Sequence, residues 1–106
     1  MVATVFAAAI DALFADPNLG IEAVYRSGGA DPGEPVRVIL RRPDRIGEFG
    51  EARIVAAAVM IDVRVSEVAA PAEGDTFAVD GMVYIVQGAP ARDAERLVWT
   101  SEARPQ

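Results

Sequence analysis

The chain contains no cysteine, no histidine and no lysine, so that all ten of its basic residues are arginines. Without cysteine it can form neither disulfides nor thiolate metal sites. The lack of histidine removes the commonest general base and metal ligand, and the lack of lysine removes Schiff-base chemistry. We therefore expect no enzymatic activity, no catalytic or metal-ligating residues and no cofactor.

Long apolar runs are also missing. No stretch reaches the roughly 18 residues of a membrane span, and Asp11 and Asp16 interrupt the apolar N-terminal segment, which lacks the basic start of a signal peptide. We expect a cytoplasmic protein without membrane contact. The formal net charge of −6 argues against tight binding of nucleic acid, whose affinity comes mainly from neutralised phosphates. An acidic surface could still line a passage through which DNA slides.

What is present is a chain of 106 residues, 52% of them apolar, which suits one domain over residues 1–106 with a real core. Residues 2–15 have helical periodicity, and Asp16-Pro17 should end the helix. The other face of this helix is rich in alanine; it could let another backbone approach closely, or it could be a plain exposed face. The apolar stripe consists of Val2, Val5, Phe6, Ile10, Leu13 and Phe14.

Between about residues 19 and 102 the apolar period is two, which is typical of strands. We expect strands at 21–26, 35–41, 54–67, 75–79, 82–86 and 95–102, and a frayed tail at 103–106. About six strands in so short a chain bury best as a small antiparallel barrel or tight sandwich, with the helix packed against one end or side. The fold class is therefore mainly β. Some apolar residues would remain outside the core and mark an interface; these are Ile39, Met60, Val83 and Ile85.

The segment 42–53 has no clear period and predicts a long central loop, which in a small domain is often functional. Ile46 and Phe49 could anchor a partner or tuck back onto the barrel. The neighbouring arginines could touch DNA phosphate, meet an acidic subunit, or be balanced by Asp44 and other acids of the loop; the net charge favours protein contact. The candidate interface residues are Arg37, Arg41, Arg42, Arg45, Ile46, Glu48, Phe49, Glu51 and Arg53.

A β-hairpin is predicted around Asp80-Gly81, a preferred type I′ pair. A two-residue turn would pair Phe77 with Tyr84 and give one face to the apolar residues. Asp75 and Asp80 flank the first strand and could be read as a carboxylate pair, but aspartate at a turn usually accepts backbone N–H groups. The structural hairpin residues are Asp75, Phe77, Asp80, Gly81 and Tyr84, and the shared face is Phe77, Val79, Met82, Tyr84 and Val86.

Several segments together carry a resemblance to a known family. They are Phe6–Phe14, Val36–Leu40 with the following Arg41–Asp44, Val63–Val68, Gly74–Val86 and Arg96–Trp99. The most distinctive is the hairpin, which reads Gly-Asp-x-Φ-x-Φ-x-Gly-x-x-Φ-x-Φ, where Φ is apolar. In this combination the chain resembles the lambda-type head–tail joining proteins of tailed phages. They are also called head-completion or stopper proteins, with relatives in prophages and gene-transfer agents.

The resemblance implies a structural connector in a virion or phage-like particle that is assembled in the host cytoplasm. It implies a homo-oligomeric ring, hexameric or dodecameric, between the portal or adaptor and the tail terminator or tail tube. Double-stranded DNA would pass through the lumen without tight binding. Two alternatives stay open: a tail terminator or minor tail protein, and an OB-like nucleic-acid-binding module, which would use aromatic residues for base stacking.

Overall fold

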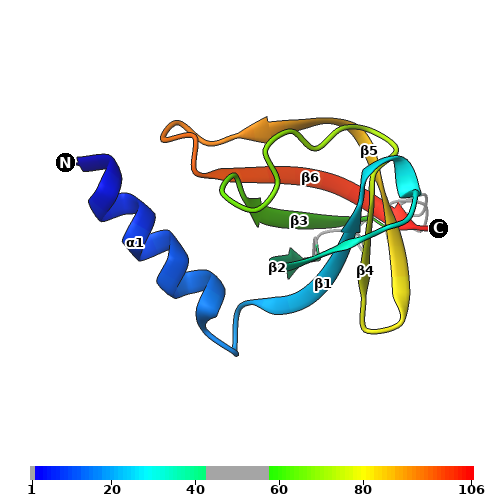
Figure 1. The fold of residues 1–106 in the computed structure, drawn as a ribbon, viewed down its shortest axis with the longest axis horizontal. Coiled ribbons are helices and arrows are strands. Elements are labelled where there is room, and N and C mark those ends of the chain that lie inside the picture. The colour runs from blue at the N-terminus through cyan, green and yellow to red at the C-terminus, as the bar shows by residue number, and fades with distance from the viewer. Residues whose placement is uncertain (1, 43–57) are drawn as a thin grey trace, which may run out of the picture.

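The computed structural model describes residues 2–42 and 58–106 (Figure 1). It contains one N-terminal helix and six strands, so the expectation of a mainly β fold is confirmed. The elements in chain order are α1 (Val2–Ala15), β1 (Ile21–Arg26), the 3₁₀ turn η1 (Ser27–Gly29), β2 (Glu34–Arg41), β3 (Val59–Arg64), β4 (Thr76–Val79), β5 (Met82–Arg92) and β6 (Val98–Pro105).

The six strands form a closed antiparallel barrel in the order β1-β2-β3-β6-β5-β4. Each strand is hydrogen-bonded to a neighbour on both sides, and β1 closes the circle by pairing with β4. Closure protects every edge, which an open sheet of this size would expose. The strands therefore adopt the closed arrangement that was expected to bury a short chain rich in alternating strands.

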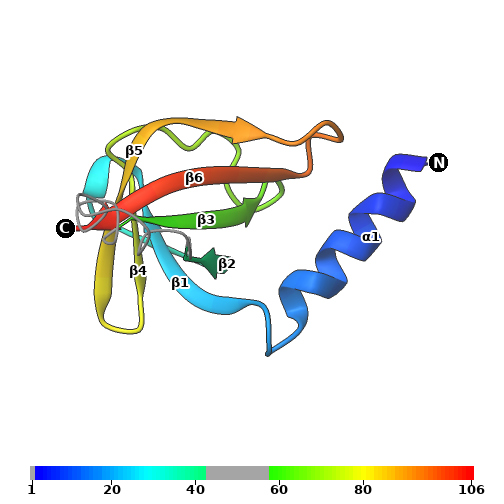
Figure 2. The same cartoon turned by 180° about the vertical axis from the view of Figure 1, so that it is seen from behind.

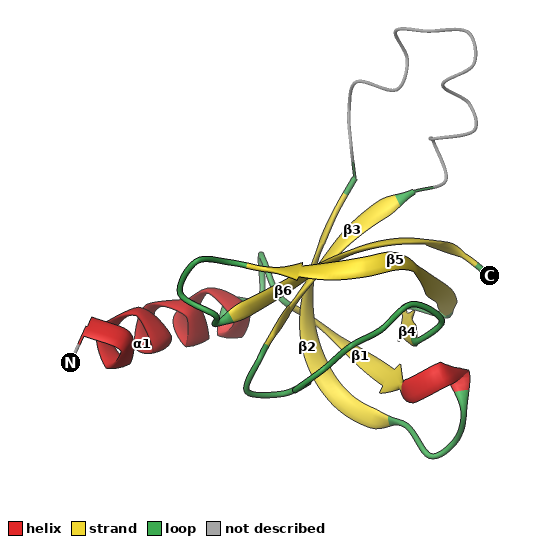
Figure 3. Ribbon diagram, turned by 90° about the horizontal axis from the view of Figure 1, so that it is seen from above, coloured by secondary structure: helices red, strands yellow, loops and turns green. Residues whose placement is uncertain are grey.

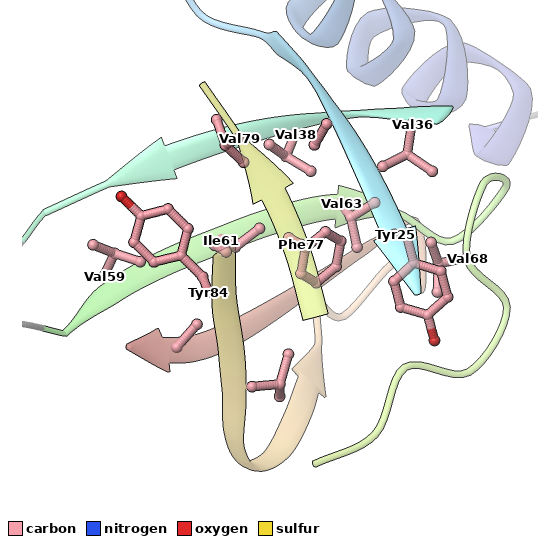
Figure 4. Close-up of a cluster of buried hydrophobic side chains, with 13 residues drawn as sticks. Tyr25, Val36, Val38, Val59, Ile61, Val63, Val68, Phe77, Val79 and Tyr84 are labelled. Carbon is pink, nitrogen blue, oxygen red and sulfur yellow. The ribbon is translucent and has the colours of Figure 1, made fainter. Parts of the chain in front are cut away.

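The core consists of the inward-facing side chains of these strands (Figure 4). Alternation places Val36 and Val38 of β2 inside while Arg37 points out, and Ile61 and Val63 of β3 are fully buried in the same way. The rings of Tyr25 and Phe77 pack with their centres 5.3 Å apart. The remaining core residues include Ala23, Val59, Val68, Val79, Tyr84, Val86 and Ala103.

The predicted hairpin is confirmed in its register. Val79 pairs with Met82 and Phe77 pairs with Tyr84. Asp80 and Gly81 have φ values of 52° and 82°, as a type I′ turn requires. The apolar side chains share the inner face, except that Met82 lies at the tip and is 45% exposed.

Strand β3 ends earlier than expected. Residues 65–67 form a turn, in which the amide of Val68 donates to the carbonyl oxygen of Arg64 at 3.1 Å. The alternation of apolar and polar residues in the sequence therefore extends beyond the end of the strand. The first part of the expected strand, residues 54–57, lies outside the described residues.

The C-terminal region also differs from expectation. Strand β5 does not stop at Gly88; it continues to Arg92 through an irregularity between Gln87 and Ala91. The tail is not frayed, because β6 runs to Pro105 and the fully buried Ala103 pairs with Val59 and Val86. Residues 95–97 belong to the preceding turn. Pairing with β3 and β5, together with burial of Ala103, thus orders a tail that was expected to be frayed.

Helix α1 projects from one end of the barrel, opposite the end at which the chain terminates (Figures 1 and 2). Phe14 is buried, but Val5 and Leu13 are 66% and 46% exposed. Much of the expected apolar stripe of the helix is therefore not covered by the barrel. Within residues 2–42 and 58–106, no helix has the length and hydropathy needed to cross a membrane.

Candidate functional site

The last turn of α1 is held by Arg37, which points outward from β2. The Nε of Arg37 donates to the carbonyl oxygen of Phe14 at 2.7 Å, and its Nη2 donates to the carbonyl oxygen of Gly20 at 2.7 Å. The final carbonyls of a helix have no intrahelical partner and carry a partial negative charge. The guanidinium of Arg37 therefore satisfies one of these carbonyls, that of Phe14, by hydrogen bonding and by charge.

A second arginine, Arg64 at the end of β3, holds the side of the helix. Its Nη1 donates to Asp11 at 3.0 Å and its Nη2 to Glu67 at 2.9 Å. The guanidinium carbon also lies 5.3 Å from the ring centre of Phe14. Burial acts to lower the pKa of Arg64, but the carboxylates of Glu67 and Asp11 outweigh it and raise the pKa above its ordinary value.

Glu67 connects the two arginines, because its Oε1 also accepts a hydrogen bond from the backbone amide of Arg37 at 3.0 Å. Gly20 completes the arrangement: a Cβ there would lie 2.0 Å from the carbonyl oxygen of Phe14, so only glycine fits. We call this set the helix anchor; its members are Asp11, Phe14, Gly20, Arg37, Arg64 and Glu67. It fixes one end of α1 and leaves the other projecting.

The anchor determines which side of α1 faces away from the barrel. Ala7, Ile10 and Asp11 face Arg64 across a small hollow of about 80 Å³. The alanine side was expected either to let another backbone approach or to be a plain exposed face, but part of it is turned toward the barrel. The exposed apolar side chains lie on another arc, which we call the outer face; it consists of Val5, Phe6, Ala9 and Leu13.

The arginines proposed as interface residues differ in their surroundings. Arg37 is engaged in the anchor. Arg41 forms a two-pronged ion pair with Asp62, at 3.0 and 2.8 Å, and Thr100 donates to the same carboxylate at 2.8 Å. The hydrogen bonds from Arg41 to Asp62 raise the pKa of Arg41 despite partial burial. The charge of Arg41 is thus already paired with an acid of the same chain, Asp62.

Arg42 is exposed just after β2. The other candidates, namely Arg45, Ile46, Glu48, Phe49, Glu51 and Arg53, lie outside the described residues, so the structure does not bring the proposed interface together.

The carboxylate of Asp75 has a structural role. It is buried and accepts hydrogen bonds from the hydroxyl of Tyr25 and from the amides of Gly28 and Ala72, both at 2.8 Å. Asp80 lies at the opposite end of β4, exposed at the hairpin tip. The two aspartates do not form a carboxylate pair, as their turn positions indicated. Burial, and then the bond to Asp75, raises the pKa of Tyr25 to about 12.

The outer surface of the barrel has one further feature, an open hollow of about 480 Å³ over β1, β2 and β4. Val24 pairs with Ala78 on one side and with Pro35 on the other, so three apolar side chains form a row across its floor. Glu22 and Arg37 lie at the hollow as well. No sequence motif indicated this hollow, because its row comes from three separate strands.

The alternative function, an OB-like nucleic-acid-binding module, would need exposed aromatic side chains for base stacking. Tyr25, Phe77 and Tyr84 are in the core, with exposures of 9%, 0% and 3%, and cannot stack on bases. Trp99 is half-buried, with the guanidinium of Arg92 4.9 Å from its ring centre. Within the described part of the chain, no three potential metal-ligating side chains come together.

Comparison with known proteins supplies the family. Residues 3–103 match the family model of the phage head-tail attachment protein, a match that includes both α1 and the barrel. Neither the curated proteins nor the solved structures contain a significant match. A family match over almost the whole chain agrees with the resemblance carried by the hairpin and the flanking strands. The chain therefore belongs to the phage head-tail attachment protein family.

Proposed function

We propose that the protein is a head-completion or stopper connector, which forms a ring between the portal or adaptor and the tail and lets DNA pass through its lumen. The family supports a structural role at the head–tail junction. The observation that carries the finer proposal is the projecting helix. Four of the five large apolar side chains exposed in the described part of the chain belong to α1 or to its connection to β1, namely Val5, Phe6, Leu13 and Leu19.

A closed barrel supports the same reading. Because every strand is paired on both sides, the barrel offers no free edge for strand addition, and contacts to other subunits must use side-chain surfaces. The outer face of α1 is one such surface. The half-buried Ile39, Met60, Val83 and Ile85, which lie outside the core on β2, β3 and β5, supply further apolar side chains.

The charge suits a passage for DNA. A net charge of −6 repels phosphate, so DNA can move past without the tight binding that neutralised phosphates give. We infer no catalytic role, since the partly buried carboxylate of Asp62 and the buried carboxylate of Asp75 serve the ion pair and the turn described above. Arg42 and the other candidates of segment 42–53 remain our proposed contacts for a neighbouring protein.

Removal of the protein from its phage or phage-like particle tests the role. We expect electron micrographs to show DNA-packaging heads and complete tails that are not joined, and joining to return when the wild-type chain is supplied. Normal tailed particles in its absence would contradict the proposal. Tails of abnormal length would instead identify the alternative function, a tail terminator.

A further inference from the structure

We propose that the outer face of α1 docks into the hollow over β1, β2 and β4 of a second copy of this chain. This pairing rests on the proposed ring and names the two surfaces that join neighbouring subunits. One surface is convex and apolar, the other is open and has an apolar floor. Both are exposed on the same molecule.

The helix cannot bury its outer face on its own barrel. The anchor holds Phe14 and Gly20 at the C-terminal end of α1, while the N-terminal end projects far from the strands (Figure 3). Val5 is 66% exposed and Phe6 42% exposed as a result. Burial of such side chains against a neighbouring molecule would remove apolar surface from water and so favour association.

The hollow suits a helix because its floor is built from small side chains. Val24, Pro35 and Ala78 lie side by side on three adjacent strands, and small residues let a helix axis approach a surface closely. The hollow is open and measures about 480 Å³. It therefore accepts bulky side chains such as Phe6 and Leu13 from outside.

Charge favours the same pairing. Asp11 is the one charged side chain of α1, and it is bound to Arg64 on the side of the helix that faces the barrel. The outer face is therefore uncharged, as the apolar floor requires. The first turn contains no acidic residue, so the positive end of the helix dipole is not offset and is attracted to the hollow, whose charged lining residues are two acids, Glu22 and Glu67, and one arginine, Arg37.

The pairing is head-to-tail, because the two surfaces differ. Contacts of this kind close into a ring or continue as a filament, whereas a contact between identical surfaces stops at a dimer. Arg37 takes part in both features, since it lines the hollow and holds the helix anchor. The anchor thereby fixes the angle at which each helix leaves one barrel and reaches the next.

The absence of native cysteine permits a direct test by disulfide cross-linking. The variant Phe6→Cys/Ala78→Cys carries one thiol on the outer face and one on the floor of the hollow. Oxidation of this variant, in concentrated solution and in assembled particles, should give a ladder of dimers, trimers and larger species that collapses on reduction. The control variant Phe6→Cys/Glu102→Cys, with its second thiol on β6 across the barrel, should give no ladder.

Three results would overturn the docking pair: an equal ladder from the control, an internal disulfide in monomers of the test variant, or no ladder either in solution or in particles. Cross-linking of Phe6→Cys to a different particle protein would also reject it and would identify another partner for the helix. The connector role is judged separately, because joined particles that contain the protein at the junction but give no ladder would retain the function and reject only this pairing.

Discussion

Arg37 of β2 donates a hydrogen bond of 2.7 Å to the carbonyl oxygen of Phe14 in α1, and so joins the helix to the barrel through a side chain and a backbone group. The contact connects residues 23 positions apart. With Arg64 it decides the direction in which α1 projects. The outer face is available for a partner because this end of the helix is fixed.

Replacement of Arg37 should release the helix from the barrel. Arg37→Met removes two charge-assisted hydrogen bonds, and we expect a loss of about 2 kcal/mol in the free energy of unfolding. Hydrogen exchange should accelerate in residues 2–15 more than in the strands. The matched control is Arg104→Met at an exposed position of β6, which should change neither property. Unchanged hydrogen exchange in the helix of Arg37→Met would show that the anchor does not hold the helix.

The turn at Gly81 should not tolerate a β-branched residue. Gly81 has a φ of 82°, a conformation that valine resists. We expect Gly81→Val to lower stability by about 1–2 kcal/mol and Gly81→Asn to lower it much less, because asparagine adopts this conformation more readily. Thermal unfolding measures the stability of both variants. Equal melting temperatures for wild type and Gly81→Val would contradict the type I′ assignment.

The burial of Tyr25, together with its hydrogen bond to Asp75, should make stability depend on pH in the alkaline range. The pKa of Tyr25 is raised from 10.0 to about 12, so the folded protein retains the phenol proton after the unfolded chain has lost it. The resulting contribution, on the order of 2 kcal/mol, is complete below pH 10 and is lost as the pH rises toward about 12.

Urea unfolding across this pH range detects the effect. Tyr25→Phe should be less stable at neutral pH and should lack this alkaline loss, whereas Tyr84→Phe should keep it. The same alkaline loss in Tyr25→Phe would assign the dependence to another group.

The outer face should matter for assembly and little for folding. Phe6→Glu places a charge on a residue that is 42% exposed, so the barrel should remain as stable as the wild type while head–tail joining falls strongly. Met82→Glu is a close control, because Met82 is 45% exposed at the hairpin tip. Infectivity or gene-transfer titre measures joining. Met82→Glu should join heads and tails normally; joining at the wild-type level by Phe6→Glu would show that the outer face is not an assembly surface.

The sequence predicted local features better than distant ones. The register of the Asp80-Gly81 hairpin and the inside and outside of β1 and β2 follow from turn chemistry and alternation, which short windows contain. The direction of α1 does not, because periodicity shows which residues are apolar but not which arc meets the barrel. That choice depends on Asp11 and Arg64, 53 positions apart.

The candidate site shows the same division between local features, which the sequence predicted, and distant contacts, which it did not. Asp75 was recognised as a turn residue from its position after Gly74, but its bond to Tyr25 required the fold. Arg37 was predicted as an interface residue, and its role in the helix anchor was missed because the partners of its side chain are backbone carbonyls, which leave no mark in the side-chain pattern. The order of β6 to Pro105 was missed because it depends on pairing with Tyr84.

Reconstruction of the head–tail junction by electron cryomicroscopy, in particles that contain this chain, tests the central claim most directly. We predict a closed ring of these barrels between the portal or adaptor and the tail, with DNA density along its axis. Density for the protein only along the tail tube or at the tail tip would contradict the account.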